Sequence, residues 1–184
     1  VKVDYPRFRT VNTECLATSL LIRNHCDILI HVNVPVPENV PSHNRITAFE
    51  DTCQKYHVPY ELMLGDLGST YETTFDRIKE TFETIEEKYP DRKKGIFFAN
   101  DTYANIFLNL IIQKYGHLPE QYRLVGFDNS PIANEAIVPI TTIGQQIDKI
   151  AETALELLVS QMDEMKKRKP SPLKTPVHKQ ITPV

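Results

Sequence analysis

The chain has 184 residues, of which 41% are hydrophobic and 24% charged, and these values are typical of a globular domain rather than of a disordered segment. Its 21 basic and 24 acidic side chains give a net charge of −3, which excludes the strongly basic composition of a nucleic-acid-binding domain. No apolar run approaches the roughly 20 residues that cross a bilayer, and the first residues lack a signal-peptide core, so a soluble, cytoplasmic protein without membrane contact is expected.

Apolar runs of strand length alternate with segments of helical periodicity along the chain. This alternation predicts β-α-β units and therefore an α/β fold with a doubly wound, mostly parallel sheet. The expected strands are residues 27–34, 60–64, 95–99, 122–127 and 141–143, with a short edge element at 1–3 and a tail strand near 178–182. The expected helices are residues 13–23, 42–56, 69–88, 101–115, 131–136 and 145–165.

Capping signals mark several of these helix starts. Ser42 stands where the second helix begins, and Ser69 with Glu72 fits a capping box, in which the two side chains satisfy free amides at the helix start. Ser130 followed by Pro131 is typical of an N-cap and a first helical residue. The first helix is expected to bury three leucines, which are Leu16, Leu20 and Leu21.

The helix expected at residues 145–165 carries one continuous apolar stripe. A stripe of this kind on a surface helix normally packs against a partner. Its members recur at helical spacing and are Ile147, Ile150, Ala151, Ala154, Leu155, Leu158 and Met162. The sequence therefore predicts that this helix has a packing partner.

Polar side chains lie close to the ends of several expected strands. In a parallel sheet these ends meet at one edge, where doubly wound domains bind ligands. Taken singly, each residue has an ordinary explanation, such as a helix cap for Asp101, a turn for Asp128 and a surface cation for Arg45. As a set they combine donors and acceptors in a way that suits a ligand rich in vicinal hydroxyl groups, such as a sugar. The set is Arg45, Asp66, Asn100, Asp101, Asp128, Asn129 and Gln145.

Signatures of catalysis and of cofactor binding are missing from the sequence. The six histidines are scattered without an H-E-x-x-H pattern, and the three cysteines lack a C-x-x-C spacing. Neither a G-x-S-x-G elbow, a G-x-G-x-x-G turn nor a P-loop can be written. We therefore expect a protein that is not an enzyme, with no cofactor and no metal site.

Several motifs follow one another in a specific order and spacing. They are Asn24-His25 before a strand, Asn44-Arg45 followed by Phe49, Asn100-Asp101 before a helix, Val125-Gly126-Phe127-Asp128 at a strand end, and Pro139 before Thr141-Thr142-Ile143 and Gln145. In this order the motifs resemble the effector-binding domain of LacI/GalR-type transcriptional regulators, and the resemblance covers nearly the whole chain. Arabinose-type repressors, which join a GntR-like DNA-binding domain to this sensor, are a candidate subgroup.

The resemblance implies a type I periplasmic-binding-protein-like architecture, of which the chain holds mainly the C-terminal lobe. It also implies a small sugar or related metabolite as the effector. Family positions that contact the sugar match Arg45, Asn100, Asp128 and Gln145, and further candidates are Asp66, Tyr71 and Asp101. The aromatic platform that often follows the family's Gly-Asp turn is absent, because Leu67 stands there, and Tyr71 or Tyr103 would have to replace it.

The resemblance further implies a domain organisation and a set of partners. Residues 1–143 would form the C-terminal lobe, residues 144–166 a helix that packs on an N-terminal lobe not contained in the chain, and residues 167–184 the tail. The DNA-binding domain is also expected to be absent, so DNA binding and a homodimer are expected of the full-length regulator. Two alternatives remain open: a sugar-transport binding protein, which would carry a signal peptide, and an enzyme of doubly wound fold, which would need a nucleophile or a metal.

Overall fold

A five-stranded parallel sheet forms the centre of the structure, a computed structural model that describes residues 14–38, 40–166, 179 and 181. Its strands are β1 (Ile28–Asn33), β2 (Tyr60–Leu64), β3 (Lys94–Phe98), β4 (Tyr122–Phe127) and β5 (Thr141–Ile143). Their order is β2-β1-β3-β4-β5, and every pairing is parallel. The predicted doubly wound sheet is thus confirmed. The predictions for residues 1–3 and for most of residues 178–182 fall outside the described residues.

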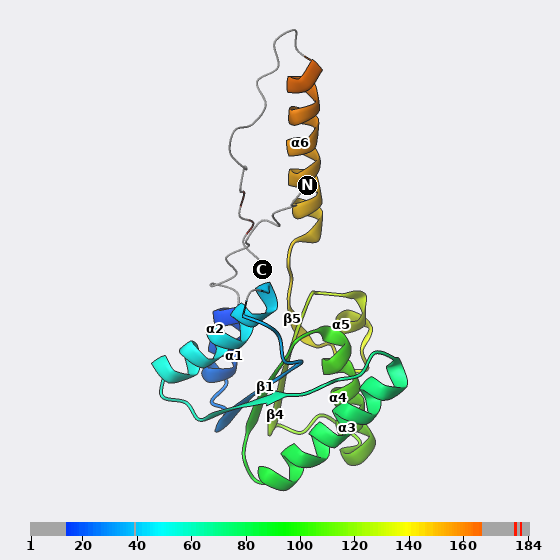
Figure 1. Cartoon of the computed structure of the whole chain (residues 1–184). Coiled ribbons are helices and arrows are strands. Elements are labelled where there is room, and N and C mark those ends of the chain that lie inside the picture. Colours follow the sequence, from blue (N-terminus) through cyan, green and yellow to red (C-terminus); the bar gives the residue numbers. More distant parts are fainter. Residues whose placement is uncertain (1–13, 39, 167–178, 180, 182–184) are drawn as a thin grey trace.

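Helices cover both faces of the sheet, as Figure 1 shows. On one face lie α1 (Glu14–Arg23) and α2 (Pro41–Lys55). On the other face lie α3 (Tyr71–Lys88), α4 (Asp101–Tyr115) and α5 (Pro131–Glu135). Because both faces are covered, β1 and β3 are buried along their whole length, and this is why most of their residues are apolar.

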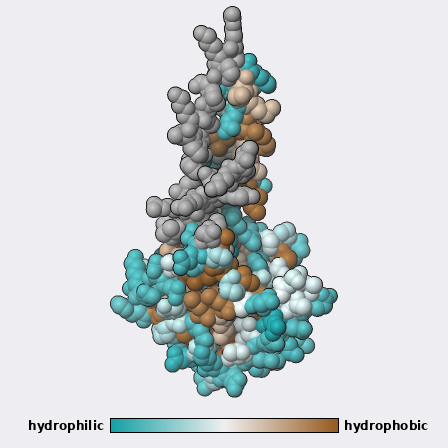
Figure 2. Space-filling view, viewed as in Figure 1, coloured by the Kyte–Doolittle hydropathy of each residue, from teal (hydrophilic) through white to brown (hydrophobic). Residues whose placement is uncertain are grey.

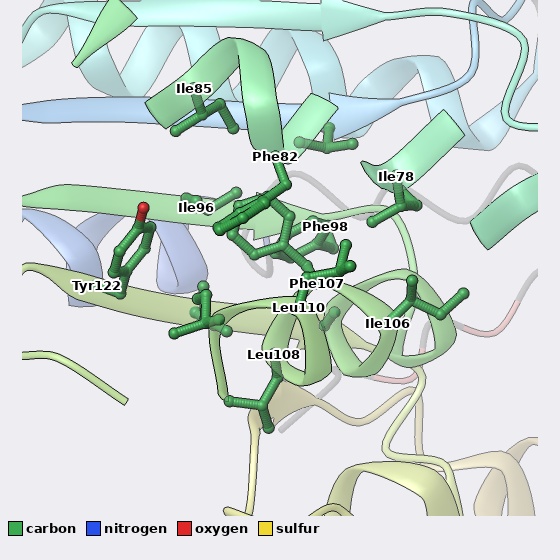
Figure 3. Packing of buried hydrophobic residues seen from close by; sticks show 14 of the residues in the cluster. Ile78, Phe82, Ile85, Ile96, Phe98, Ile106, Phe107, Leu108, Leu110 and Tyr122 are labelled. Atoms are coloured by element: carbon green, nitrogen blue, oxygen red, sulfur yellow. The ribbon is translucent and has the colours of Figure 1, made fainter. Parts of the chain in front are cut away.

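Each face of the sheet has its own hydrophobic core. The core under α3 and α4 is rich in aromatic rings, and Figure 3 shows how Phe82, Phe98 and Phe107 pack together there. The core under α1 and α2 includes Phe49, Phe97 and Phe127. The second core continues to the carboxyl edge of the sheet, since Phe127 is the last residue of β4.

The first helix buries fewer leucines than the sequence predicts. Leu21 is 1% exposed, whereas Leu16 and Leu20 are 50% and 37% exposed. Ala17 and Thr18 are buried instead. The side of α1 that faces the sheet is therefore rotated from the leucine stripe towards smaller residues, which let the helix approach the strands closely.

Three helix starts differ from the prediction. The capping box of α3 is formed by Thr70 and Thr73, not by Ser69 and Glu72. The preceding Gly68 has a φ of 78°, and this left-handed residue brings the chain into the helix one residue later than predicted. The helix α2 begins at Pro41, so that Ser42 lies inside it, and α6 (Ile147–Lys166) begins two residues after the predicted position 145.

The long helix α6 stands away from the sheet, as Figure 1 shows. None of its residues is buried, and Figure 2 shows apolar side chains along its surface. The most exposed large apolar side chains are Ile147, Leu155, Leu158, Val159, Met162 and Met165, at 51% to 63%. The packing of this stripe on a second lobe stays a prediction. Among the described residues, no helix combines the length and apolar character that a bilayer crossing requires.

Candidate functional site

The carboxyl ends of the five strands lie at one edge of the sheet, because every pairing is parallel. The strand order reverses between β1 and β3, and a crevice beside such a reversal is the usual ligand site of a doubly wound sheet. Arg45 reaches this edge from α2. Its Nη1 donates a hydrogen bond to the carbonyl oxygen of Ala99 at 2.7 Å, and its guanidinium carbon lies 3.8 Å from the centre of the Phe127 ring. These two contacts hold the cation above the ends of β3 and β4.

Asn100 lies two residues after the end of β3 and is the N-cap of α4. Its Oδ1 accepts a hydrogen bond from the backbone amide of Tyr103 at 2.9 Å. Capping therefore fixes the orientation of the side chain. It leaves the Nδ2 amide group as the part that can donate to a ligand at the edge.

Asp128 and Gln145 lie together, although 17 residues separate them. Gln145 Nε2 donates to Asp128 Oδ1 at 2.6 Å. Asp128 follows β4 and has a φ of 103°, a backbone conformation that residues other than glycine rarely adopt. An open hollow of about 510 Å³ lies between this pair and the first turns of α6, and Asp148, Lys149 and Glu152 line its far side. The pair therefore presents carboxylate and amide groups at the point where the chain leaves the sheet.

Asp101 is the one predicted contact residue that is fully buried, with 1% of its surface exposed. Its Oδ2 accepts hydrogen bonds from the backbone amide of Ser130 at 2.7 Å and from the Ser130 hydroxyl at 3.0 Å. Its Oδ1 accepts from the Thr142 hydroxyl at 2.5 Å. Both carboxylate oxygens are thus occupied by the chain itself, so we place Asp101 behind the site rather than in it. Ser130 is the N-cap of α5 as predicted, but its hydroxyl bonds to Asp101 instead of capping the helix.

Gly126 in β4 leaves room for the Asp101 carboxylate. A Cβ at position 126 would lie 2.2 Å from Asp101 Oδ1 and 3.3 Å from the Asp101 Cα. We expect Gly126→Ala to lower the free energy of unfolding by about 2 kcal/mol, because Asp101 must then give up hydrogen bonds that it makes in a buried place. Urea unfolding at pH 7.5 measures this. Gly65→Ala is the matched control, since nothing lies within 4 Å of its added Cβ; equal losses in both variants would contradict the expectation.

Asp66 and Tyr71 belong to the segment that follows β2, the edge strand opposite β5. Asp66 follows the edge strand β2 and accepts a hydrogen bond from the amide of Gly68 at 2.9 Å, in the turn before α3. Tyr71 is 63% exposed and packs on Phe75. Because β1 and β3 separate β2 from β4, the ends of β2 and β4 are about 14 Å apart at the usual strand spacing. The structure therefore does not bring Asp66, which follows β2, next to Asp128 and Gln145, and Tyr71 is the first residue of α3.

Tyr103, the other predicted replacement for an aromatic platform, lies in the first turn of α4, where it is half buried. It packs against the core under α3 and α4. Its backbone amide is the group that Asn100 caps. Of the two tyrosines, Tyr103 is thus the one next to a predicted contact residue.

Two polar residues at the end of β1 were not predicted to matter. His31 is fully buried between the rings of Phe49 and Phe97, with ring centres 5.3 Å and 4.8 Å away. Its Nδ1 lies 2.9 Å from the carbonyl oxygen of Phe97, which can only accept, so Nδ1 carries the proton and Nε2 can accept from Asn33 Nδ2 at 3.3 Å. Burial lowers the pKa of His31 to about 4, despite the hydrogen bond to Phe97. The only local signal was two polar residues spaced by two in an apolar strand.

Comparisons with known proteins agree with this fold. The family model of the periplasmic binding protein-like domain matches residues 17–180. The ribose operon repressor of Halalkalibacterium halodurans is 23% identical over 149 residues, which are 81% of this chain and 43% of that repressor. The chain thus spans less than half the length of this relative.

Solved structures with the same fold include two regulators. A LacI family protein from Silicibacter pomeroyi superposes with a TM-score of 0.74 at 16% identity, over 96% of this chain and 50% of that one. A LacI family transcriptional regulator from Enterococcus faecium, solved with bound ribose, has a TM-score of 0.67 at 20% identity, over 86% of this chain and 57% of that one. The family match, the relative and the folds confirm the resemblance that the sequence motifs predicted.

Proposed function

The chain belongs to the family of periplasmic binding protein-like domains, and from this premise we propose that it is the ligand-sensing domain of a LacI/GalR-type transcriptional regulator with a small sugar as effector. The observation that carries the proposal is the arrangement of Arg45, Asn100, Asp128 and Gln145 along one edge of the sheet, beside the reversal in strand order. The ribose operon repressor among its relatives supports a pentose as the first ligand to test.

The chemistry of these four residues favours an uncharged polyol. A guanidinium group donates, a carboxylate accepts, and the two amides do both, so adjacent hydroxyl groups of a sugar could each find a partner. Arg45 and Asp128 carry opposite charges. A phosphate group would gain from Arg45 but would be repelled by Asp128, so we infer a neutral sugar rather than a sugar phosphate.

The proposed mechanism is a shift between two arrangements of lobes. A ligand that contacts the sheet edge on one side and a second lobe on the other stabilises the arrangement in which both contacts form. The segment from β5 to α6 is suited to transmit such a change, since Gln145 bonds to Asp128 at one end of it and the apolar helix α6 follows at the other. Coupling of this kind alters the affinity for DNA by a factor that equals the effect of DNA on ligand affinity.

The proposal assigns the remaining partners to the whole regulator. DNA would be bound by a separate domain, the regulator would act as a homodimer, and control of transcription would place it in the cytoplasm. No catalytic role is proposed, and the relatives include the ribose operon repressor.

A ligand panel tests the function on the full product of the gene that encodes this chain. Thermal unfolding is followed with D-ribose, D-xylulose, D-xylose, L-arabinose, maltose, cellobiose and D-ribose 5-phosphate, each at several concentrations. We expect a pentose to raise the melting temperature in a concentration-dependent way, because a ligand that binds the folded state adds RT ln(1 + [L]/Kd) to its stability. A panel in which no sugar raises it would contradict the sugar-sensor proposal, and a shift with the phosphate alone would contradict the neutral ligand.

A further inference from the structure

The turn that carries Asp128 has an unusual backbone. Asp128 and Asn129 have φ values of 103° and 51°, so two successive residues other than glycine have positive φ. Each such residue costs of the order of 1 kcal/mol or more and persists only where its surroundings hold it. Residues 128–130 are here called the aspartate turn.

The aspartate turn is held by a short chain of hydrogen bonds that ends on a buried carboxylate. The amide of Asn129 donates to Thr142 Oγ1 at 3.1 Å, and the same hydroxyl donates to Asp101 Oδ1 at 2.5 Å. A hydroxyl has one hydrogen and two lone pairs, so it can accept from Asn129 and donate to Asp101 at once. The other oxygen of Asp101 accepts from the amide and the hydroxyl of Ser130. Both Asn129 and Ser130 are therefore fixed through Asp101.

The aspartate turn is also tied to the strand that leads to α6. The amide of Asp128 donates to the carbonyl oxygen of Ile143 at 2.9 Å, and Gln145 donates to the Asp128 carboxylate. Three groups of the aspartate turn are thus held by the segment that follows it. Thr142 holds the amide of Asn129, Ile143 holds the amide of Asp128, and Gln145 holds the Asp128 carboxylate. If the backbone at Asp128 relaxed to a common conformation, its Cα–Cβ bond would point in a different direction, and the carboxylate would leave both Gln145 and the sheet edge.

We propose that Thr142 and Asp101 are positioning residues, which set the direction of the Asp128 carboxylate through the aspartate turn and do not touch the ligand. The part of this proposal that concerns the ligand rests on the proposed function, whereas the part that concerns the turn does not. Asp101 thereby changes from a candidate contact to a support. Thr142, which belongs to a sequence motif but was not a candidate site residue, links the aspartate turn to Asp101.

A set of three variants isolates the Thr142 hydroxyl. Thr142→Val removes the hydroxyl and keeps the shape and the preference for a strand. Thr142→Ser keeps the hydroxyl and serves as the conservative rescue. Thr141→Val is the matched control, because Thr141 is the exposed neighbour in the same short strand.

The first readout needs no ligand. Amide exchange of Asn129 and the side-chain amide signals of Gln145 are followed by NMR in the free protein. We expect Thr142→Val to speed the exchange of the Asn129 amide by roughly 10-fold or more, because this amide loses its acceptor. The Gln145 signals should shift, because the Asp128 carboxylate that Gln145 bonds would change its orientation. Thr142→Ser and Thr141→Val should match the wild type. Wild-type exchange and unchanged Gln145 signals in Thr142→Val would overturn the proposal, whatever the ligand is.

The second readout is the affinity for D-ribose, compared in wild-type and Asp128→Asn backgrounds. Thr142→Val should weaken D-ribose binding roughly 10-fold in the wild type, the size expected for a misdirected hydrogen bond to a charged group, and should add nothing in Asp128→Asn. A residue that only stabilises the fold would lower the melting temperature in both backgrounds without this difference in affinity. Faster exchange with unchanged D-ribose affinity in the wild type would overturn the positioning role and leave the proposed function intact. A wild type that binds no sugar would instead contradict the proposed function, and the exchange of Asn129 would still decide whether Thr142 holds the turn.

Discussion

Arg45→Met and Asp128→Asn are each expected to weaken sugar binding by roughly 100-fold. A hydrogen bond to a charged group contributes about 1.5–3 kcal/mol, and each 1.4 kcal/mol is a factor of ten in the dissociation constant. Methionine keeps an unbranched side chain over the ring of Phe127, on which the guanidinium lies 3.8 Å from the ring centre, so the fold should persist while the charge is lost. Asparagine tolerates the positive φ of position 128 better than most residues, so this change also removes mainly the charge.

Matched controls exist for both variants. Arg77→Met removes an arginine of α3 whose side chain is 53% exposed, pairs with Glu80 and lies beside Met63 and Leu64 of the edge strand β2. Asp163→Asn removes an exposed carboxylate on α6 that pairs with Lys166. Isothermal titration with the sugar that gives the largest thermal shift measures all four. If Arg45→Met and Asp128→Asn bound it as tightly as the controls do, the site would lie elsewhere.

A third variant, Asp66→Asn, tests how far the site extends. Asp66 follows the edge strand β2 and already accepts a hydrogen bond from Gly68. We expect it to change sugar affinity by less than about threefold, since two strands separate it from β4. A loss comparable to that of Asp128→Asn, measured by the same titration, would mean that the ligand spans the sheet edge as far as β2.

The elements themselves were predictable because their limits are written locally. The helix α4 begins after a capping Asn100 and ends at Gly116, whose φ of 75° is the left-handed stop that glycine supplies. The strand β2 lies between Pro59 and Gly65, and its predicted limits are those of the structure. Burial on both faces of the sheet keeps most residues of β1, β3 and β4 apolar, and this marked these strands in the sequence. The parallel direction of the strands then followed from the alternation of elements, since parallel strands need crossover helices.

The supports of the site could not be predicted because their partners are distant in sequence. Asp101 meets Ser130 and Thr142 at separations of 29 and 41 residues, and nothing near Asp101 distinguishes this role from a helix cap. Ser130 gave a correct N-cap signal, yet its hydroxyl bonds to Asp101. Local patterns report how a residue serves its own element, whereas the use of a buried polar atom is decided by whatever the fold places next to it.

The same limit applies to His31, whose carbonyl partner on Phe97 is 66 residues away. Its burial between two aromatic rings lowers the pKa to about 4, from an ordinary value of 6.5. Between these two pH values the unfolded chain binds a proton that the folded protein does not. Stability therefore rises with pH through this window, and it is lost as the pH falls from about 6.5 towards 4. The positive charge of Arg45 acts in the same direction as burial, because it also disfavours a charged imidazole.

We expect His31 to make the protein acid-sensitive by roughly 3 kcal/mol between pH 7.5 and pH 4, since one pKa unit corresponds to about 1.4 kcal/mol. That is a large part of the 5–15 kcal/mol that stabilises an ordinary domain. Glu61 affects stability at lower pH. Burial raises the pKa of its carboxyl group, but hydrogen bonds from Lys88 and Tyr89 outweigh burial and lower it. The stability that Glu61 contributes is therefore lost only as the pH falls below about 4.5.

Urea unfolding at pH 7.5, 6.5, 5.5 and 4.5 for wild type, His31→Gln and His117→Gln separates the histidine from the carboxylate. In His31→Gln the free energy of unfolding should be lower at pH 7.5, because glutamine cannot stack between Phe49 and Phe97, but it should change little from pH 6.5 to 4.5. His117→Gln, which alters an exposed histidine, should keep the full wild-type dependence. A wild-type slope that persisted in His31→Gln would assign the acid sensitivity to other groups. The buried imidazole is thus favoured in its neutral form, in which Nδ1 donates to the Phe97 carbonyl and Nε2 can accept from Asn33 at the end of β1.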